Sequence, residues 1–215
     1  MAQRPVYRVN DIKPFYECHM VDFIYNGGCS VSQKQKNITA IHEAYHKTYP
    51  NDRVLEISTK SLQPIGTYLS AFNLLKYVPS IQKSIPVENV YQGGKVFEQN
   101  GPLLDLYEVT PREAKIDERL NQNGSLQTFY FEGKTFPTSP KTAFYDWIYM
   151  NAVMENSGLI EEFCQYDAFT DVEFNPKASI NCQARAAAIF VSLFRAGIIE
   201  KIKLFDEFVN LTNKI

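Results

Sequence analysis

The pattern of apolar and polar positions in the first part of the chain predicts strands on either side of a helix. Residues 5–10 alternate between apolar and polar, and 21–25 form a short apolar run. Apolar side chains then recur at helical spacing to about residue 49, and 53–58 indicate a further strand. Such a strand–helix–strand unit is most simply parallel, so we expect a β-α-β arrangement within residues 1–58.

A longer helix is predicted over residues 84–99. Ser84 is suited to cap its start, and Pro86 falls in the first turn, where a missing N–H costs nothing. Because each residue turns a helix by about 100°, Glu88 and Lys95 fall on one stripe. A carboxylate and an amine on one face are candidates for acid–base and nucleophilic chemistry. The alternative is a solvated surface with a weak ion pair.

Gly93 and Gly94 lie inside this predicted helix, next to the lysine. Each glycine costs roughly 1 kcal/mol relative to alanine in a helix interior. We therefore expect another part of the chain to pack closely against the backbone at this point.

The rest of the chain predicts helices, a hairpin and one irregular segment. Thr110 and Glu113 enclose Pro111 in a capping box that starts a helix, and Glu132 with Gly133 marks the hairpin tip. The predicted elements are helices at 110–120, 139–155, 159–165, 182–196 and 200–213, a hairpin at 127–136, and an irregular stretch at 166–181 with a short extended piece at 172–174.

Composition indicates a folded protein of one domain. The chain has 215 residues, of which 45% are hydrophobic and 13% aromatic, enough for a substantial core. We expect a single α+β or α/β domain over 1–215. The net charge of −2 argues against a surface that grips nucleic acid non-specifically. A signal peptide and a long apolar run are both absent, so we expect a soluble, cytoplasmic protein with no membrane partner.

Metal-ligating residue types give no clear site, and we expect neither a metal nor a cofactor. The 4 cysteines form no CxxC pair and are expected to be reduced. His42 and His46 suit a metal by their spacing, but Lys47 follows directly and a surface pair is favoured. The acidic residues Asp167, Asp171 and Glu173 lack the glycine and the terminal glutamate of a calcium-binding loop.

Two loops are candidate anion sites. The glycine turn and helix start at Gly28–Lys34 would leave N–H groups that suit a phosphate; the alternative is a plain turn and cap. Lys60, Ser61 and Gly66 follow the strand at 53–58, and ligands collect beyond the carboxyl ends of strands in α/β sheets. The alternative there is a polar loop.

Four segments together resemble a known family. Leu69–Asn73 is similar to an FSNF-like motif, and Val87–Phe97 to a helix of the type SEHYFQAQKF. Thr110–Lys115 is similar to a helix start of the type SP, two residues, A, and Asp167–Asn181 to an aspartate loop that leads into a helix. In this order and spacing they resemble the NADAR family (NAD- and ADP-ribose-associated) over roughly residues 60–196.

The chain also departs from the family pattern. Asn89 replaces the common histidine, Gly93 and Gly94 replace alanine and glutamine, and the aspartate loop lacks its glycine–tryptophan portion. Residues 1–58 resemble the N-terminal extension found in the antitoxin branch of DarT–DarG-type toxin–antitoxin pairs, and 59–215 would be the family core.

The resemblance implies a NADAR-like fold, mainly helical around a small mixed β-sheet, with the β-α-β extension added. It implies an ADP-ribosyl glycohydrolase that removes ADP-ribose from guanine in single-stranded DNA, as the antitoxin to a DNA ADP-ribosyltransferase toxin. One alternative is a non-catalytic binder of NAD-derived nucleotides, or an antitoxin that contacts its toxin directly. A further alternative is an N-glycosidase that acts on a small soluble nucleotide.

Carried onto this chain, the resemblance implies roles for named residues. Glu88 would be the acid/base, Lys95 the nucleophile that forms a Schiff base, and Asp171 the group that orients Lys95 or the ribose hydroxyls. Lys34 is a second candidate nucleophile. The predicted substrate-binding residues are Ser30, Lys34, Lys60, Ser61 and Gly66 for the diphosphate, Phe72 or Tyr91 for the base, Asn73 or Asn181 for the ribose hydroxyls, and Gln92. Packing or capping is the alternative role for each.

A DNA substrate also requires positive charge near the site. The basic rim that would supply it consists of Lys34, Lys36, Arg53, Lys60, Lys76 and Lys83.

Overall fold

The structure is a computed structural model, and it describes residues 2–176 and 179–212. The chain divides into two compact units. The first unit combines Met1–Ser70 with Ser157–Ile215, and the second unit is Ala71–Asn156. The first unit is thus built from both ends of the chain, so the N-terminal elements share their core with the C-terminal ones.

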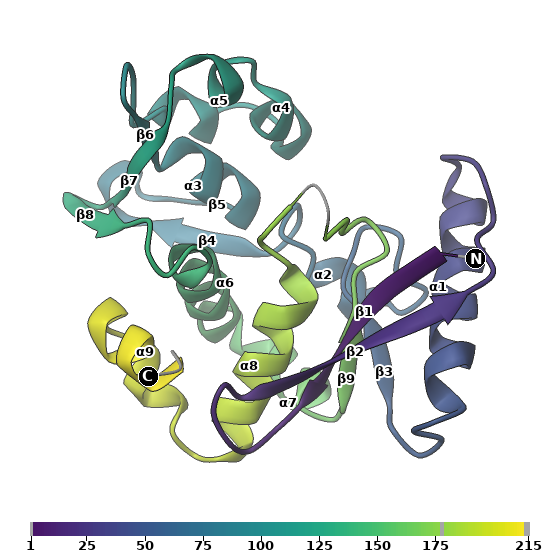
Figure 1. Cartoon of the computed structure of the whole chain (residues 1–215). Helices are drawn as coiled ribbons and strands as arrows, with labels where there is room; N and C mark the ends of the chain where they lie inside the picture. The colour runs from purple at the N-terminus through teal and green to yellow at the C-terminus, as the bar shows by residue number, and fades with distance from the viewer. Residues whose placement is uncertain (1, 177–178, 213–215) are drawn as a thin grey trace. The chain divides into compact units, whose positions relative to one another are not determined.

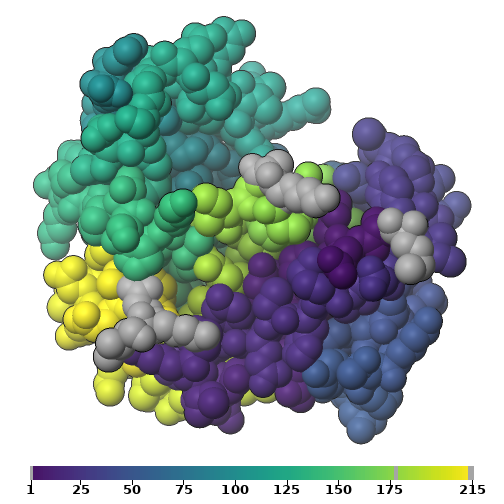
Figure 2. Space-filling view, viewed as in Figure 1, coloured from purple at the N-terminus to yellow at the C-terminus, as the bar shows by residue number. Residues whose placement is uncertain are grey.

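The first unit contains a mixed four-stranded sheet in the order β2-β1-β9-β3 (Figure 1). Its strands are β1 (Ala2–Val9), β2 (Tyr16–Phe23), β9 (Ala168–Thr170) and β3 (Val54–Glu56). β1 is antiparallel to both β2 and β9, whereas β3 is parallel to β9. The strands β2 and β3 therefore run in the same direction, as predicted, but two other strands separate them. The β1–β2 hairpin lies at the surface in Figure 2.

Two long helices cover opposite faces of this sheet (Figure 1): α1 (Val31–His46) and α8 (Gln183–Arg195). Ala168 belongs to the apolar core under α1. The next residue, Phe169, packs against Phe163 with the ring centroids 5.3 Å apart, on the side of α8. Because side chains alternate along a strand, the short strand β9 serves both faces.

The remaining elements of the first unit are short. They are α2 (Pro64–Tyr68), η3 (Ser157–Leu159), α7 (Ile160–Phe163), η4 (Ile199–Ile202) and α9 (Phe205–Thr212). The extended piece predicted at 172–174 is wrong, because the strand falls earlier, at β9. After that strand, the Asp171 carboxylate accepts hydrogen bonds from the N–H groups of Glu173 and Phe174, which turns the chain.

The second unit contains two antiparallel sheets and several helices. The sheets are β4 (Leu75–Val78) with β5 (Lys83–Pro86), and β6 (Lys95–Phe97) with β7 (Leu126–Phe131) and β8 (Lys134–Pro137). The helices are η1 (Pro79–Ile81), α3 (Val87–Gly93), η2 (Leu104–Tyr107), α4 (Pro111–Ile116), α5 (Arg119–Gln122) and α6 (Ala143–Glu155).

Aromatic rings join α6 to the three-stranded sheet. Phe129 of β7 stacks on Phe144 of α6 with the centroids 4.5 Å apart. The ring centroid of Phe136 in β8 lies 5.2 Å from the centroids of both Phe144 and Trp147. Ring pairs of this kind add to the free energy gained by burial alone, so they fix the sheet on the helix.

Two local predictions are confirmed in this unit. Thr110 and Glu113 form both halves of the capping box. Glu132 and Gly133 connect β7 to β8 with φ values of 48° and 76°, the left-handed pair that a tight hairpin turn requires. The predicted α+β class is also confirmed.

Candidate active site

The helix predicted over 84–99 is wrong in its extent, because β5, α3 and β6 occupy this stretch in turn. Ser84 is a strand residue opposite Tyr77 and does not cap the helix. The first N–H groups of α3 donate instead to backbone carbonyls, from Val87 to Leu74 and from Glu88 to Ala71, both at 2.9 Å. Tertiary contacts thus define the start of the helix.

The glycine pair ends α3, and the predicted close approach is confirmed. A Cβ on Gly93 would lie 2.5 Å from the ring of Tyr107. A Cβ on Gly94 would lie 2.6 Å from the carbonyl oxygen of Tyr130, whose own N–H donates to the carbonyl of Gly94 at 2.7 Å. Any other side chain at these positions would push the β7 backbone or the tyrosine ring away.

Lys95 therefore lies on strand β6, opposite Phe129 of β7. Its ammonium nitrogen lies 4.7 Å from the centroid of the Tyr91 ring. Burial lowers the pKa of Lys95 from 10.5 to about 8. The charge of Glu88 acts in the opposite direction and raises this pKa. The carboxylate and the amine are thus within electrostatic reach, although they do not share a helix.

Glu88 is almost entirely buried, with 6% of its surface exposed. The amide nitrogen of Gln92, one helical turn further along α3, donates to its Oε1 at 2.8 Å. The three side chains of Glu88, Gln92 and Lys95 form what we call the α3–β6 cluster. It offers a carboxyl group for proton transfer and an amine that is easily deprotonated.

The predicted base-stacking residues differ in their surroundings. Tyr91 is buried among aromatic rings, with Tyr145 at 5.2 Å and Phe129 at 5.6 Å, and Lys95 lies over its ring. These contacts favour packing for Tyr91, while stacking on a base stays a prediction. Phe72 is half-buried, with the Lys115 ammonium 5.2 Å from its centroid, and Asn73 is exposed.

A second group of predicted residues lies in the first unit, where β3 and β9 end side by side. Lys60 and Ser61 form a polar turn here, and the Lys60 ammonium donates to Thr59 at 2.8 Å. Gly66 packs so closely against the Glu56 carbonyl and the Ser61 hydroxyl that no side chain would fit. These residues share the carboxyl edge of two parallel strands, as a ligand site in an α/β sheet would.

The loop after β9 meets the start of α1 at the same edge. The Lys34 ammonium pairs with the Glu173 carboxylate at 3.1 Å. Ser30 is exposed and caps α1, accepting the N–H of Gln33 at 3.3 Å. Asp171 is buried in the loop, while Asn181 lies just before Cys182, the N-cap residue of α8.

A buried polar network under this loop was not predicted from the sequence. Glu56 is fully buried, and burial raises its pKa. It accepts the Thr170 hydroxyl at 2.6 Å and the N–H of Val172 at 2.8 Å. The His42 ring nitrogen lies 2.9 Å from the same hydroxyl. The sequence pattern places Glu56 in a strand but does not indicate that its side chain is buried. The burial depends on the pairing of β3 with β9, which lies over a hundred residues later in the chain.

The expectation of a surface histidine pair is wrong for His42. Residues 42–46 have the HExxH spacing of zinc-binding helices. However, His42 faces Thr170, and burial lowers its pKa to about 4. The His46 ring lies 2.9 Å from the carbonyl oxygen of Asp52. Across the part of the chain that the structure describes, no three metal-ligating side chains are grouped for a metal ion.

We expect Glu56 to fix the loop that carries Asp171. The Glu56→Ala variant leaves the Val172 N–H buried without its acceptor, while the Thr170 hydroxyl still has the His42 ring nitrogen within reach. This should lower the free energy of unfolding by about 1–3 kcal/mol. The Glu56→Gln variant keeps an oxygen that accepts the Val172 N–H, so its free energy of unfolding should fall by about half as much. Urea unfolding measures both, with the exposed Glu43→Ala as the control. Equal stability of Glu56→Ala and wild type would contradict the network.

Half of the residues in the predicted basic rim pair with acidic side chains. Lys76 is buried and pairs with Glu155 at 2.5 Å, and Lys83 pairs with Glu108 at 3.2 Å. Lys34 is paired with Glu173, as described above. The Arg53 guanidinium lies 5.0 Å from the centroid of the Tyr166 ring. Three of the six charges thus pair with carboxylates, and the buried Lys76 does not belong to an exposed rim.

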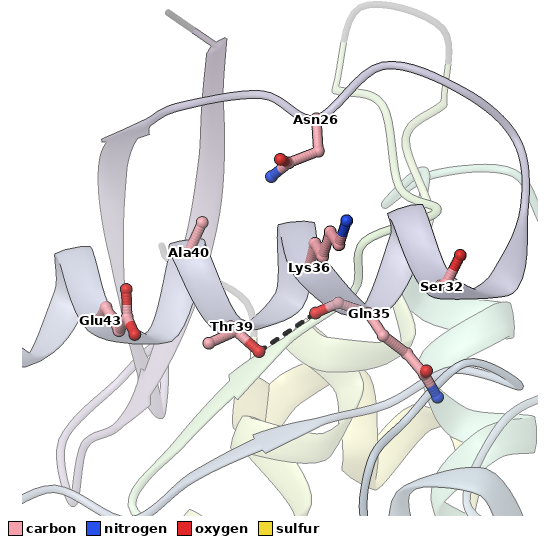
Figure 3. A pocket seen from close by; sticks show the side chains of 7 residues that line it. All are labelled: Asn26, Ser32, Gln35, Lys36, Thr39, Ala40 and Glu43. Atoms are coloured by element: carbon pink, nitrogen blue, oxygen red, sulfur yellow. Dashed lines mark hydrogen bonds between the residues drawn. The ribbon is translucent and has the colours of Figure 1, made fainter.

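Lys36 lies beside a cavity of about 470 Å³ along the outer side of α1 (Figure 3). Figure 3 shows its side chain pointing toward Asn26, on the segment that precedes the helix. The cavity is lined by Asn26, Ser32, Gln35, Lys36, Thr39, Ala40 and Glu43. None of the predicted catalytic or substrate-binding residues belongs to this lining, so it is separate from the candidate site residues.

A family model matches nearly the whole chain. The family described as DarT1-associated NADAR antitoxin matches residues 2–215, which includes residues 2–58. The chain is therefore an antitoxin of the NADAR family. More narrowly, it belongs to the DarT1-associated antitoxins, and its partner is the cognate ADP-ribosyltransferase toxin. No curated protein matched it. Among the described residues, none of the helices has the length and apolar character to cross a membrane.

Proposed function

We propose that this antitoxin is an ADP-ribosyl glycohydrolase that removes ADP-ribose from guanine in single-stranded DNA, and so reverses the modification made by its toxin. The observation that carries the proposal is the amine of Lys95, half-buried with a pKa of about 8 within reach of the Glu88 carboxylate. A lysine in this state has a sizeable neutral fraction, and only the neutral amine is a nucleophile.

The chemistry follows from these two groups. Glu88 protonates the ring oxygen of the ribose, and the ring opens to an iminium between C1 and the exocyclic nitrogen of guanine. The Lys95 amine adds to C1, a proton passes to the guanine nitrogen, and the C1–N bond breaks with its electron pair on guanine. A Lys95–C1 iminium remains. Water adds to C1 and expels the lysine, which releases ADP-ribose and restores the acid.

The first unit has a separate part in the proposal. Lys60 and Ser61 would bind an anionic group such as the diphosphate, which is supported by their position at the carboxyl edge of β3. Asp171 would orient ribose hydroxyls. The buried Glu56 network under its loop supports this role, because a fixed loop holds a positioning side chain in place.

An oligonucleotide that carries ADP-ribose on one guanine tests the function. We expect wild-type protein to yield the unmodified strand and free ADP-ribose, measured by chromatography and mass spectrometry. A stable complex without product would indicate a non-catalytic binder. Faster turnover of ADP-ribosylated guanosine than of the oligonucleotide would indicate a glycosidase of small nucleotides. A test without turnover of either substrate would overturn the proposal.

A further inference from the structure

The side chain of Gln92 has one polar end engaged and the other without a partner. Its amide nitrogen donates to Glu88 Oε1 at 2.8 Å, and the residue is 7% exposed. Its amide oxygen is buried and has no hydrogen-bond partner among the described residues. Buried acceptors are nearly always paired in folded proteins, so this oxygen requires an explanation.

The orientation of the amide is fixed by its neighbour. Turning it over would place the Gln92 oxygen 2.8 Å from a carboxylate oxygen, where two acceptors repel each other. Asn89, also on α3, has a buried amide oxygen without a partner as well. However, its nitrogen donates to the carbonyls of Leu106 and Val109, which makes it a clamp on the backbone. Gln92 is instead tied to the proposed acid.

We propose that Gln92 determines which base is accepted: its amide oxygen accepts a hydrogen bond from a base N–H next to the scissile nitrogen. This inference rests on the proposed function. Guanine linked through its exocyclic nitrogen presents the N1–H donor at that place. Adenine and cytosine linked through their exocyclic nitrogens present a ring nitrogen that is an acceptor. A buried acceptor rejects these bases, because two acceptors would face each other without a proton.

The same hydrogen bond serves the acid. Because Gln92 occupies Oε1 of Glu88, the other carboxyl oxygen is left for the proton that opens the ribose ring. A base whose N–H reaches Gln92 is thereby placed beside that oxygen. Recognition of the base and alignment of the proton donor thus depend on one side chain.

Binding measured without turnover tests the inference. In a Lys95→Met background, we compare an oligonucleotide carrying ADP-ribose on guanine with one carrying it on 1-methylguanine, which lacks the N1–H. We expect the methylated base to weaken binding by about 10- to 100-fold. Adding Gln92→Ala should weaken binding of the first oligonucleotide and bring the two affinities to within about threefold. Gln127→Ala, at an exposed residue of the same unit, is the control and should keep the difference.

Each outcome supports the inference or overturns it. Equal binding of the two oligonucleotides to the Lys95→Met protein would overturn the inference. An unchanged ratio of the two affinities after Gln92→Ala is added would overturn it as well. A lack of binding to either oligonucleotide would also overturn it. If Gln92→Ala fails to fold by circular dichroism, Gln92→Met replaces it, since methionine fills a similar volume without an acceptor for the N–H. Discrimination in binding without wild-type turnover would refute the hydrolase and leave the base-reading role standing.

Discussion

The Lys95→Met variant should release ADP-ribose from the modified oligonucleotide at least about a thousandfold more slowly than the wild-type protein. Methionine keeps an unbranched side chain over the ring of Tyr91 but has no amine, so it preserves packing and removes the nucleophile. Lys95→Arg should be equally inactive, because a guanidinium stays protonated and cannot attack a carbon.

The matched control is Lys83→Met, which removes an exposed lysine of the same unit that pairs with Glu108. This variant should keep wild-type turnover, because surface ion pairs contribute little to stability. Turnover by Lys95→Met within tenfold of wild type would refute the assignment. Circular dichroism and urea unfolding of each variant separate loss of the amine from loss of the fold.

The wild-type rate should depend on pH through the same amine. With a pKa of about 8 for Lys95, about a tenth of the molecules carry a neutral lysine at pH 7, against about three in ten thousand for an unperturbed lysine. The reacting state needs this neutral amine together with a protonated Glu88, so the pair must hold one proton. The rate under single-turnover conditions should therefore fall about tenfold from pH 9 to pH 10, where the pair has lost that proton. A flat profile from pH 8 to pH 10 would show that the reaction does not depend on this proton.

The Glu88→Gln variant should lose about 10²- to 10⁴-fold of the rate, because the amide cannot transfer a proton to the ribose. It should also move the pH profile of the remaining activity. The charge of Glu88 raises the pKa of Lys95, so its removal lowers that pKa below about 8. Without the acid only the neutral amine is needed, so the remaining rate should rise with pH and level off below pH 8.

Single-turnover rates across the pH range measure both effects, and Glu108→Gln, at an exposed carboxylate of the same unit, is the control. A loss of rate with no movement of the profile would show that Glu88 does not act on Lys95. Retention of the full rate would exclude Glu88 as the acid.

Features set by adjacent residues could be predicted from the sequence. The capping box of Thr110 with Glu113 and the turn at Glu132 and Gly133 depend on local geometry, and both are confirmed. The extent of the helix at 84–99 could not be predicted in this way. β4 pairs with residues before α3, and the carbonyl of Tyr130 meets Gly94 after it. Because those contacts come from distant segments, local patterns do not reveal them. They make strands of the residues before and after α3, where the sequence pattern predicts helix.

The candidate site shows the same division. The helical pattern of the sequence places Glu88 and Lys95 on one stripe, yet these residues interact across α3 and β6. The glycine pair between them gave a usable signal. Because glycine is unfavourable inside a helix, the pair predicted that another part of the chain packs against the backbone there, and this packing is found where α3 ends. Glu56 carried no such signal: its burial depends on β9, which no local pattern connects to β3. The pairing of Lys34 and Lys76 could not be predicted either, because their acidic partners are distant in sequence.

Chemical trapping tests the role of Lys95 most directly. The protein is mixed with the ADP-ribosylated oligonucleotide and sodium cyanoborohydride, which reduces an iminium to a stable amine. We predict a mass increase of one reduced ADP-ribose on the protein, mapped by peptide sequencing to Lys95 and absent from Lys95→Met. Full turnover without any adduct, or an adduct on another lysine such as Lys34, would contradict the nucleophilic role of Lys95.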